Sequence, residues 1–351
     1  MENPDLSDII DADGHVYEND EEVFEYLEPP YRGKRTVLGF PLWPSIDGFH
    51  RGAIHAHMGL HKSFEINAPL WLEFLDRTGI ERTVLYPTAG LAHNLIRDPE
   101  WAIALARAYN DWIHDRYAKQ SPRLKAVALL PLHDPVAAAA ELRRAVEELG
   151  AAGAVLPAVG LKRPLGVVDY DPIYAEAERL DVPLGIHGGP AQMLGLDSLD
   201  HFAQVHTLAH PFSQMIQMTS IFMSGVFDRF PRVRIAFLEA GIGWVPFLAG
   251  RMDRSFRARK RPEYVGGVED LPSSYLSRGN VFFNIDPGEE AVAPAIEFLG
   301  EDTLLFASDF PHEVNAEGCI GEIQELQTTL PPSTRQKVFV ENPSRFYQFR
   351  D

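Results

Sequence analysis

Short apolar runs and longer amphipathic segments alternate along most of this sequence. The short runs are rich in Val, Ile, Leu and Phe, which is typical of strands buried on both faces. Between them apolar residues recur at helical spacing, as Ile103, Ala106, Tyr109 and Ile113 do. We predict strands at residues 9–10, 82–86, 124–130, 153–156, 182–186, 233–238, 281–285 and 303–307. We predict helices at residues 99–119, 135–149, 171–180, 213–230, 244–259, 289–299 and 321–330.

This alternation predicts consecutive βαβ units and therefore an α/β fold. Eight strands separated by helices favour a closed (β/α)8 TIM barrel over an open parallel sheet. Two irregular segments, at residues 19–67 and 188–211, follow the first and the fifth strand. We expect both to be lid insertions at the catalytic rim of the barrel. Because the chain shows neither an internal repeat nor a linker, we predict a single domain over residues 1–351.

Charge and composition narrow the range of partners. The 351 residues include 50 acidic and 32 basic side chains, which gives a net charge of −18. Such a surface repels phosphate backbones and anionic membranes, so we expect neither nucleic acid nor a membrane as partner. No apolar stretch is long enough for a bilayer, residues 1–10 lack a signal core, and the single cysteine, Cys319, excludes an intrachain disulfide. We therefore predict a cytoplasmic protein that acts on a small-molecule substrate. A homodimer is one assembly to test for this protein.

Residue types that bind metals follow four of the predicted strands. Asp13 and His15 follow the first strand, His187 the fifth, Glu239 the sixth and Asp309 the eighth. In a parallel barrel these strand ends meet at one mouth, and Asp-x-His spacing places both side chains on one face of an extended segment. One such residue alone is more often a helix cap or a polar turn residue. Four strand ends of this kind together predict a shared metal site.

The donor set leaves the identity of the metal open. Two imidazoles with two or three carboxylates, and no thiolate, suit Zn²⁺, Fe²⁺ or Mn²⁺. Two further histidines are candidates for the rim. His210 and Pro211 precede the helix predicted from residue 213, where proline is typical of a helix start, and His210 is a candidate ligand or acid/base. His312 follows Asp309 closely enough to orient it or to act at the same site.

Other candidate chemistries are weaker. The histidines at positions 50, 55, 57 and 61 have no carboxylate between them, so we expect a lid that contacts substrate, with the aromatic Phe40, Trp43 and Phe49 beside it, more than a metal site. Cys319 is expected to be a buried apolar residue, not a nucleophile. The sequence lacks a Gly-x-Ser-x-Gly elbow, a phosphate-binding loop and a dinucleotide fingerprint.

Five motifs together resemble the amidohydrolase superfamily. They are IDADGH at residues 10–15, PLGIH at 183–187, FDRFP at 227–231, EAGIGWVP at 239–246 and SDFPH at 308–312. More narrowly, they are similar to the branch that contains aminocarboxymuconate-semialdehyde decarboxylase. The similarity covers nearly the whole chain apart from residues 19–67. It implies a metal-dependent (β/α)8 barrel with Asp13, His15, His187 and Asp309 as ligands.

The chain departs from that branch at two positions. Decarboxylases of the branch carry a histidine that serves as acid/base at the end of strand six, where this chain has Glu239. The opening motif is Asp-x-His where His-x-His or Glu-x-His is common. A carboxylate at strand six can bridge a second metal ion, so a site with one ion and a site with two both stay open.

We therefore predict hydrolysis first, in which a metal-activated water attacks an amide, ester or thioester and Asp309 or Glu239 handles the proton. The alternative is a nonoxidative decarboxylase of an aromatic or enoic acid, with Arg251, Arg254 and Arg257 as candidate anchors. A second alternative is a diiron-type enzyme that activates oxygen, and the non-enzyme alternative is a barrel that only binds a ligand. The long, aromatic lid segments predict a sizeable, partly apolar substrate, as in secondary metabolism or aromatic degradation.

Overall fold

Eight parallel strands form one sheet in sequence order in the computed structural model, which describes residues 8–34, 40–50, 54, 66–259, 268, 270–312 and 314–349. The strands are β1 (Ile9–His15), β2 (Ile80–Tyr86), β3 (Leu124–Leu129), β4 (Gly153–Pro157), β5 (Leu184–His187), β6 (Ile235–Leu238), β7 (Val281–Ile285) and β8 (Leu304–Phe306). Just beyond β8, the N–H of Asp309 donates to the Asp13 carbonyl at 3.1 Å, and the N–H of His15 donates to the Phe310 carbonyl at 2.8 Å. These two bonds join the last strand to the first, and the predicted (β/α)8 barrel is confirmed.

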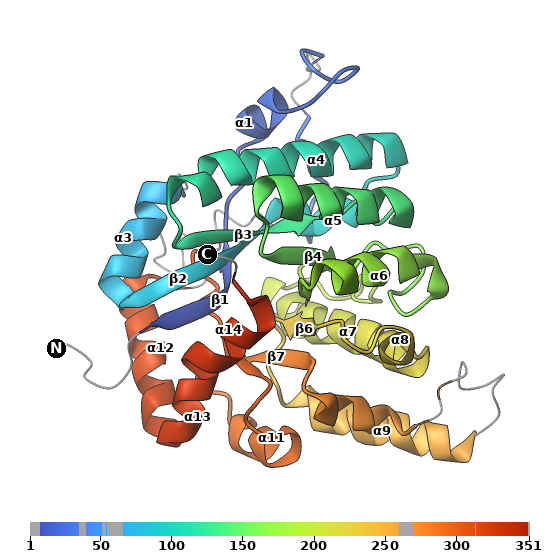
Figure 1. The fold of residues 1–351 in the computed structure, drawn as a ribbon, viewed down its shortest axis with the longest axis vertical. Coiled ribbons are helices and arrows are strands. Elements are labelled where there is room, and N and C mark those ends of the chain that lie inside the picture. The colour runs from blue at the N-terminus through green and yellow to red at the C-terminus, as the bar shows by residue number, and fades with distance from the viewer. Residues whose placement is uncertain are drawn as a thin grey trace.

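Helices surround the strands on the outside (Figure 1). They are α1 (Asp20–Glu25), α3 (Ala68–Thr78), α4 (Pro99–Arg116), α5 (Pro135–Leu149), α6 (Asp171–Leu180), α7 (Phe202–Met223), α8 (Val226–Arg229), α9 (Trp244–Ala258), α11 (Val292–Leu299), α12 (Ala316–Thr329), α13 (Pro332–Gln336) and α14 (Asn342–Tyr347). The sequence pattern did not reveal α1, α3, α13 and α14. Among the described residues, no helix combines the length and the apolar character needed to cross a bilayer.

Local sequence explains where several of these helices begin and end. Asp98 and Asp134 each accept two backbone N–H groups at the N-terminus of a helix whose first residue is proline. Proline is favoured there because the first N–H of a helix has no helical acceptor. Gly79 and Gly150 then end α3 and α5 with φ of 76° and 70°, the left-handed conformation that glycine adopts without a steric penalty.

Two predicted helix starts are wrong. Helix α12 begins at Ala316, not at residue 321. Helix α7 begins at Phe202, not at residue 213, so it contains Pro211 in its interior and His210 lies within it. Proline lacks the N–H that would complete a helical hydrogen bond, which is why the pattern favoured a helix start at this point. Gly225, with φ of 66°, then separates α7 from α8, so the helix predicted over residues 213–230 is two helices. The second irregular segment is therefore confined to residues 188–201, and the first contains α1.

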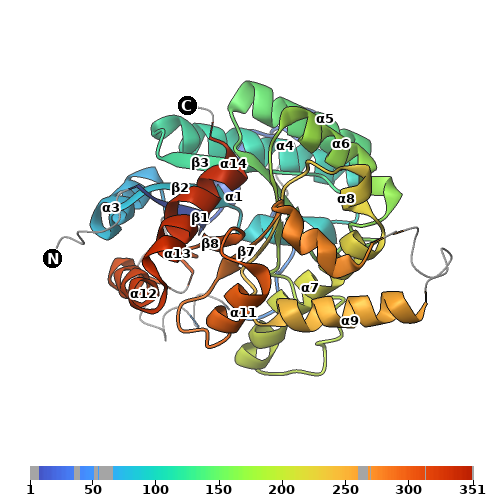
Figure 2. The ribbon, with the colours of Figure 1, turned by 60° about the horizontal axis from the view of Figure 1, so that its bottom comes forward.

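The C-terminal helices cover the end of the barrel where the strands begin (Figure 2). Arg234, next to the start of β6, donates to the Phe346 carbonyl, and the Phe346 ring lies 4.9 Å from that of Phe282. The hydroxyl of Tyr347 inserts into the barrel and donates to the Ala12 carbonyl at 2.5 Å, while it also lies 2.9 Å from the hydroxyl of Tyr86. Among the described residues, α14 therefore packs against the end of the barrel opposite to the one where the metal-binding residue types collect.

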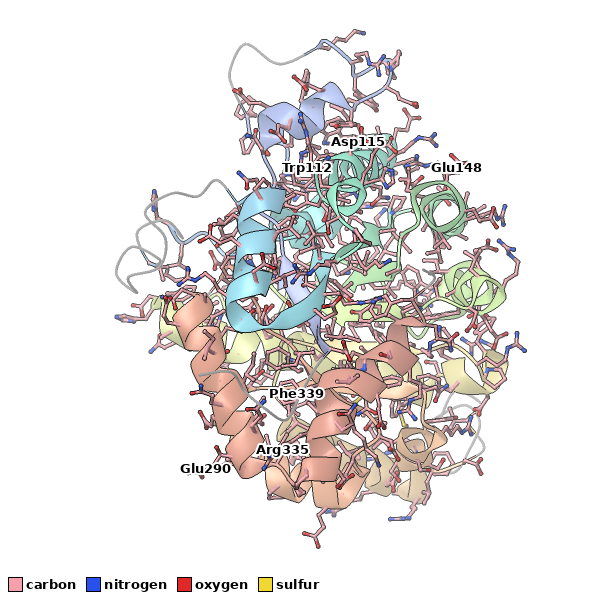
Figure 3. All side chains as sticks on the ribbon, turned by 60° about the vertical axis from the view of Figure 1, so that its left-hand side comes forward. Trp112, Asp115, Glu148, Glu290, Arg335 and Phe339 are labelled. Carbon is pink, nitrogen blue, oxygen red and sulfur yellow. The ribbon has the colours of Figure 1, made fainter. Side chains whose placement is uncertain are left out.

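The barrel and its helices share one continuous apolar core. Phe339, between α13 and α14, is fully buried, with its ring 4.9 Å from that of Phe306 in β8. Charged side chains such as Glu148 of α5 and Glu290, in the turn before α11, are exposed at the outside of the barrel (Figure 3). Burial on this scale stabilises the barrel by about 25 cal/mol for each Å² of apolar surface removed from water.

Candidate metal centre

Four side chains from three strands converge at the open end of the barrel. Asp13, His15, His187 and Glu239 each offer one nitrogen or oxygen, and these atoms all lie within 4.8 Å of one another. His187 Nε2 lies 3.3 Å from Asp13 Oδ2 and 3.0 Å from Glu239 Oε2. His15 Nε2 lies 3.4 Å from Asp13 Oδ1 and 3.8 Å from Glu239 Oε2. The structure therefore brings together residues that are more than two hundred positions apart in the chain.

Backbone hydrogen bonds orient both imidazoles. His15 Nδ1 lies 2.9 Å from the Pro87 carbonyl, and His187 Nδ1 lies 3.2 Å from the Gly188 carbonyl. A carbonyl only accepts, so each Nδ1 carries a proton and each Nε2 faces the cluster as the atom that would bind a metal ion. This is the tautomer that metal-bound histidines adopt when the other ring nitrogen donates to an outer acceptor.

The inward atoms of the cluster are buried and have no hydrogen-bond partner among the described residues. They are Asp13 Oδ1, His15 Nε2, His187 Nε2 and Glu239 Oε2. Leaving a buried polar atom unpaired costs about 1–3 kcal/mol, and more for a charged group. A divalent cation satisfies all four at once, because two imidazoles and two carboxylates are a donor set for Mn²⁺, Fe²⁺ or Zn²⁺. The residues fit the divalent metal ion that the sequence predicted.

The pKa shifts of the cluster also favour a bound cation. Burial raises the pKa of Asp13 to about 6, although His187 opposes the shift. Burial lowers the pKa of His15 to about 3, so its Nε2 is free of a proton at neutral pH. Burial also acts to lower the pKa of His187, but the carboxylates of Asp13 and Glu239 outweigh it and raise that pKa well above its ordinary value. The cluster thus holds positive charge at its centre, where a metal ion would take the place of the proton.

Two carboxylates of the site have an unusual backbone conformation. Glu239 and Asp309 follow β6 and β8 with φ of 52° and 50°, in the left-handed region that residues other than glycine rarely occupy. Such a conformation costs on the order of 1–2 kcal/mol per residue. Strain of this kind is common at functional sites, where the surrounding fold holds a side chain in place.

Asp309 lies beside the cluster and is paired with His312. Asp309 Oδ1 is 2.7 Å from His312 Nδ1 and 3.6 Å from His15 Nε2. The other ring nitrogen of His312 is 2.8 Å from Thr88 Oγ1, which fixes the plane of the imidazole. Asp309 does not cap a helix, because Asn315 is the N-cap of α12. The alternative of a capping role for Asp309 is therefore wrong.

His210 also reaches the site, from helix α7. Its Nδ1 lies 3.4 Å from Glu239 Oε1, the oxygen that faces away from His15 and His187. His206, one turn earlier, forms a further group of three possible ligands with His210 and Glu239. His206 was not among the sequence candidates, because helix α7 was predicted to begin after it. With the helix extended to Phe202, the spacing of four residues would have placed both imidazoles on one face.

Two buried polar residues that were not among the sequence candidates also hold the site in place. Asp11 accepts the backbone N–H of Ser308 at 2.8 Å and the hydroxyl of Thr83 at 2.7 Å, and so ties β1 to β2 and to the end of β8. Gln214 of α7 donates to the carbonyls of Ile186 and Leu238, both at 2.9 Å. These carbonyls immediately precede His187 and Glu239. The alternation of Asp11 with Asp13 and His15 was a readable signal, whereas nothing in the pattern marked Gln214.

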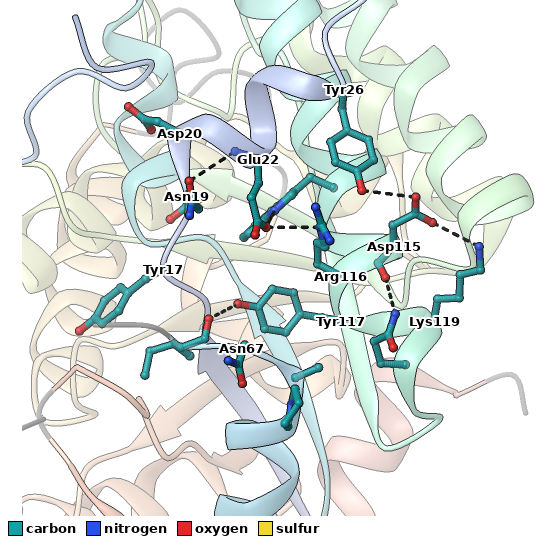
Figure 4. A pocket seen from close by; sticks show the side chains of 16 residues that line it. Tyr17, Asn19, Asp20, Glu22, Tyr26, Asn67, Asp115, Arg116, Tyr117 and Lys119 are labelled. Carbon is teal, nitrogen blue, oxygen red and sulfur yellow. Dashed lines mark hydrogen bonds and ion pairs between the residues drawn. The ribbon is translucent and has the colours of Figure 1, made fainter. Parts of the chain in front are cut away.

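A cavity of 380 Å³ opens beside the cluster. Its lining is formed by Asp13, His206, Thr207, His210, Pro211, Glu239, Ala240, Asn284, Asp286, Pro287, Ala307, Ser308, Asp309, Val314 and Glu322. A larger cavity of 1260 Å³ lies between α1, the start of α3 and the end of α4 (Figure 4). There Tyr117 donates to the Ile66 carbonyl and Tyr26 donates to Asp115, and none of the four ligands lines that cavity. We therefore assign the chemistry to the smaller cavity.

Part of the first irregular segment is packed into the protein. Trp43 is buried, with its ring 6.0 Å from that of Tyr109, so it does not contact the cavity at the cluster as a lid residue would. The Phe49 ring lies 5.7 Å from that of Phe202, while Phe40 is largely exposed. His55, His57 and His61 lie outside the described residues, so their predicted role in a lid stays a prediction.

Two other sequence candidates have no place at the site. Cys319 is fully buried, and burial raises the pKa of its thiol well above the ordinary value. Arg251, Arg254 and Arg257 lie on the exposed face of α9, and none of them lines the cavity at the cluster. The prediction that these arginines anchor a substrate carboxylate has no support from their position.

Comparison with known proteins places this geometry among relatives. The sequence pattern of the Amidohydrolase family matches residues 10–349 of this chain. The 2-amino-3-carboxymuconate-6-semialdehyde decarboxylase of Dictyostelium discoideum is 26% identical over 323 residues, which cover 89% of this chain and 86% of that protein. The gamma-resorcylate decarboxylase of Rhizobium sp. (strain MTP-10005) is 32% identical over 258 residues, with coverage of 69% and 76%. The crystal structure of 5-carboxyvanillate decarboxylase from Novosphingobium aromaticivorans, which holds manganese, superposes with a TM-score of 0.74 at 22% identity and 97% coverage of each chain.

These relatives overturn the first functional prediction. Hydrolysis was favoured because carboxylates are abundant at the strand ends, but the curated relatives are decarboxylases. The physical reason is that a carboxylate beside a metal can serve either chemistry. It can hold a proton for an attacking water or deliver one to carbon, so the number of carboxylates does not distinguish the two reactions.

Proposed function

We propose that this protein is a metal-dependent nonoxidative decarboxylase of an aromatic or enoic carboxylic acid. The chain belongs to the Amidohydrolase family and is an enzyme of the amidohydrolase superfamily. The curated relatives that support this proposal act on such acids by name. The observation that carries it is the pair of Asp309 and His312. Asp309 Oδ1 lies 2.7 Å from His312 Nδ1 and 3.6 Å from His15 Nε2 of the buried cluster. Such a pair is suited to handling a proton next to a bound acid.

Four residues would hold the metal ion in this proposal, namely Asp13, His15, His187 and Glu239. When bound, a divalent ion supplies a Lewis acid that fixes the oxygens of an acidic substrate and offsets their negative charge. Asp11 and Gln214 keep the ligands in position through their bonds to the adjacent backbone. The two imidazoles need no reorientation, because Pro87 and Gly188 already fix their tautomers.

Asp309 is the proposed proton donor. In nonoxidative decarboxylation the bond between a carbon and its carboxylate breaks, carbon dioxide leaves, and the electron pair left on the carbon takes up a proton. Asp309 delivers that proton as a carboxylic acid, and His312, 2.7 Å away, returns one to it after each turnover. Thr88 holds the far nitrogen of His312 and keeps the imidazole aligned with Asp309. General acid catalysis of this kind contributes about 10²- to 10⁴-fold to a rate.

The cavity supports a substrate of modest size. Its volume of 380 Å³ is at the lower end of the range for small-molecule sites, about 300–1,000 Å³, and suits an acid with a single ring. Pro211, Pro287 and Val314 contribute apolar walls to this cavity. A ring can therefore lie against these walls while its carboxylate faces the cluster.

Deuterium labelling tests the proposal directly. Protein loaded with Mn²⁺ is incubated in D₂O with a panel of ortho-hydroxybenzoates and dienoic acids, and the headspace and products are measured by mass spectrometry. We expect carbon dioxide and a product with one deuterium on the carbon that lost the carboxylate. Protein stripped with EDTA should release none, and Mn²⁺ should restore the reaction. Release of acid and alcohol from an ester panel, without carbon dioxide from any acid, would contradict the proposal.

A further inference from the structure

We propose that a second divalent cation binds next to the first, held by His206, His210 and the outer oxygen of Glu239. The nitrogen or oxygen that each of these residues offers lies within 4.8 Å of the other two. The proposal deepens the function proposed above, because the second ion would complete the same site. It assigns to helix α7 a role that neither the family match nor the relatives describe.

Glu239 is placed between the two groups of ligands. Its Oε2 lies 3.0 Å from His187 Nε2, inside the first cluster, and its Oε1 lies 3.4 Å from His210 Nδ1, outside it. A carboxylate with one oxygen toward each of two ligand sets is the arrangement that bridges two ions about 3.5–4 Å apart. The strained backbone of Glu239, with φ of 52°, holds the carboxylate between both sets.

Helix α7 supplies the remaining imidazoles on one face. His206 and His210 are four residues apart, and their ring centroids are 5.2 Å apart. Residues at this spacing project from the same side of a helix, as the paired histidines of helical zinc sites do. His210 is 7% exposed and His206 is half-buried. The proposed site of the second ion is therefore reached from the cavity, whereas the site of the first ion lies deeper.

A separate observation points to a ligand at this place. Asn284 lines the same cavity at the end of β7 and is 3% exposed, yet its Oδ1 has no hydrogen-bond partner among the described residues. Its Nδ2 lies 3.2 Å from Asp286 Oδ1, which leaves the carbonyl oxygen as the unpaired atom. A buried amide oxygen without a donor is costly, and a cation nearby or a water bound to it would satisfy this oxygen.

The charge of the cavity also calls for a second ion. The described residues that line it include five carboxylates, from Asp13, Glu239, Asp286, Asp309 and Glu322, and neither Lys nor Arg. With Asp309 protonated as the proposed acid and the other four carboxylates ionised, one divalent ion leaves two negative charges around a site that must accept an acidic substrate. Two ions leave none. Without the second ion the substrate carboxylate would meet net repulsion in a cavity of low dielectric constant.

Metal counting and electron paramagnetic resonance test this proposal. Purified protein is stripped, saturated with Mn²⁺ alone, passed through a desalting column and analysed for metal per chain. We expect two Mn²⁺ per chain and the spectrum of an exchange-coupled pair. The variant with both His206→Ala and His210→Ala should bind one Mn²⁺ per chain and show the six-line spectrum of an isolated ion.

A matched control lies on the same stretch of chain. His201, exposed and directly before α7, is replaced by Ala, and this variant should still bind two Mn²⁺. One Mn²⁺ per chain in the saturated wild-type protein, or an uncoupled spectrum at two per chain, overturns the proposal whether or not the double variant folds. Two ions retained by a folded double variant also overturn it. Because none of these readouts depends on carbon dioxide release, they separate this proposal from the proposed function.

Discussion

At the scale of single residues, the site has a carboxylate at the end of β6, where the family resemblance implied a histidine. Glu239 stands at the end of β6, and the imidazole nearest to its outer oxygen comes from His210 on α7. Burial acts to raise the pKa of Glu239, but His210 and His187 outweigh it and hold that pKa well below its ordinary value. Glu239 is thus an anion at neutral pH, suited to binding a cation and poorly suited to donating a proton. This leaves Asp309 and His312 to supply the proton.

Replacing Asp309 by Asn separates proton delivery from metal binding. We expect the Asp309→Asn variant to keep its metal content and to lose about 10²- to 10⁴-fold in kcat, because the amide cannot act as the acid. Metal analysis and carbon dioxide release on the same preparation check this. Loss of the metal together with activity would instead identify Asp309 as a ligand, the role that the family resemblance implied.

At the scale of elements, strand β1 positions its ligands by packing tightly around Gly14. A Cβ at Gly14 would lie 2.4 Å from Cη2 of Trp71 and 2.6 Å from Oγ1 of Thr83, closer than real contacts allow. Glycine therefore allows α3 and β2 to approach the strand between Asp13 and His15. The indole N–H of Trp71 in turn donates to the His15 carbonyl at 3.0 Å, so the helix that the sequence pattern did not reveal supports a ligand.

Substitution of Gly14 by Ala should lower the free energy of unfolding by about 1–3 kcal/mol, because the methyl group overpacks the strand. Chemical denaturation measures the change, and metal affinity should fall with it. Gly250→Ala is the control. It lies in helix α9 with open space around its Cβ, and there alanine should add about 0.5–1 kcal/mol of stability. Equal effects of the two substitutions would refute the packing argument.

Helices α5 and α6 are joined by a carboxylate between two arginines. Hydrogen bonds from Arg179 and Arg143 lower the pKa of Glu176 to about 2. A depressed pKa means that the stabilisation is complete above the ordinary pKa of 4.5 and is lost as the pH falls toward 2. Because both arginines are half-exposed, solvent screens the interaction, and we expect Glu176→Gln to cost about 1 kcal/mol at pH 7.

The pH dependence distinguishes this interaction from ordinary packing. The difference in unfolding free energy between wild type and Glu176→Gln should shrink as the pH is lowered from about 4.5 to 2, as measured by urea denaturation. A difference that stays constant over that range would show that the substitution acts through packing of the side chain and not through its charge.

At the scale of the whole molecule, both ends of the chain contribute to the barrel interior. The Tyr347 hydroxyl, close to the C-terminal end of the described residues, donates to the carbonyl of Ala12 in β1. The next residue of β1, Asp13, accepts the backbone N–H of Asp309, just beyond β8. The ligands of the first strand are therefore held from below by the C-terminal helix and from the side by the last strand.

Removing the Tyr347 hydroxyl tests this closure. Tyr347→Phe leaves the buried Ala12 carbonyl without its donor and Tyr86 without its partner, so we expect a loss of about 1–3 kcal/mol in unfolding free energy. Urea denaturation provides the measurement. The double variant Tyr86→Phe and Tyr347→Phe should cost less than the sum of the single changes, because the two hydroxyls contact each other. Full additivity would contradict that coupling.

Much of the fold was predictable from the sequence because each strand and most helices have a local signal. Apolar runs mark strands buried on both faces, and Asp-Pro pairs mark the starts of α4 and α5. The helices that the pattern missed or misplaced lack such signals. Pro211 inside α7 gives a false one, and α13 and α14 are short helices stabilised by their contacts with the barrel floor.

By itself, the sequence determined which residue types stand at the strand ends, since Asp13, His15, His187, Glu239 and Asp309 each follow a recognisable strand. Only the tertiary structure decided which oxygen of Glu239 faces which imidazole, that His206 joins the group, and that Asp11 and Gln214 hold the ligands in place. The physical reason is that residue type and spacing are local properties of the chain. Distances between side chains more than two hundred residues apart are fixed only when the barrel closes.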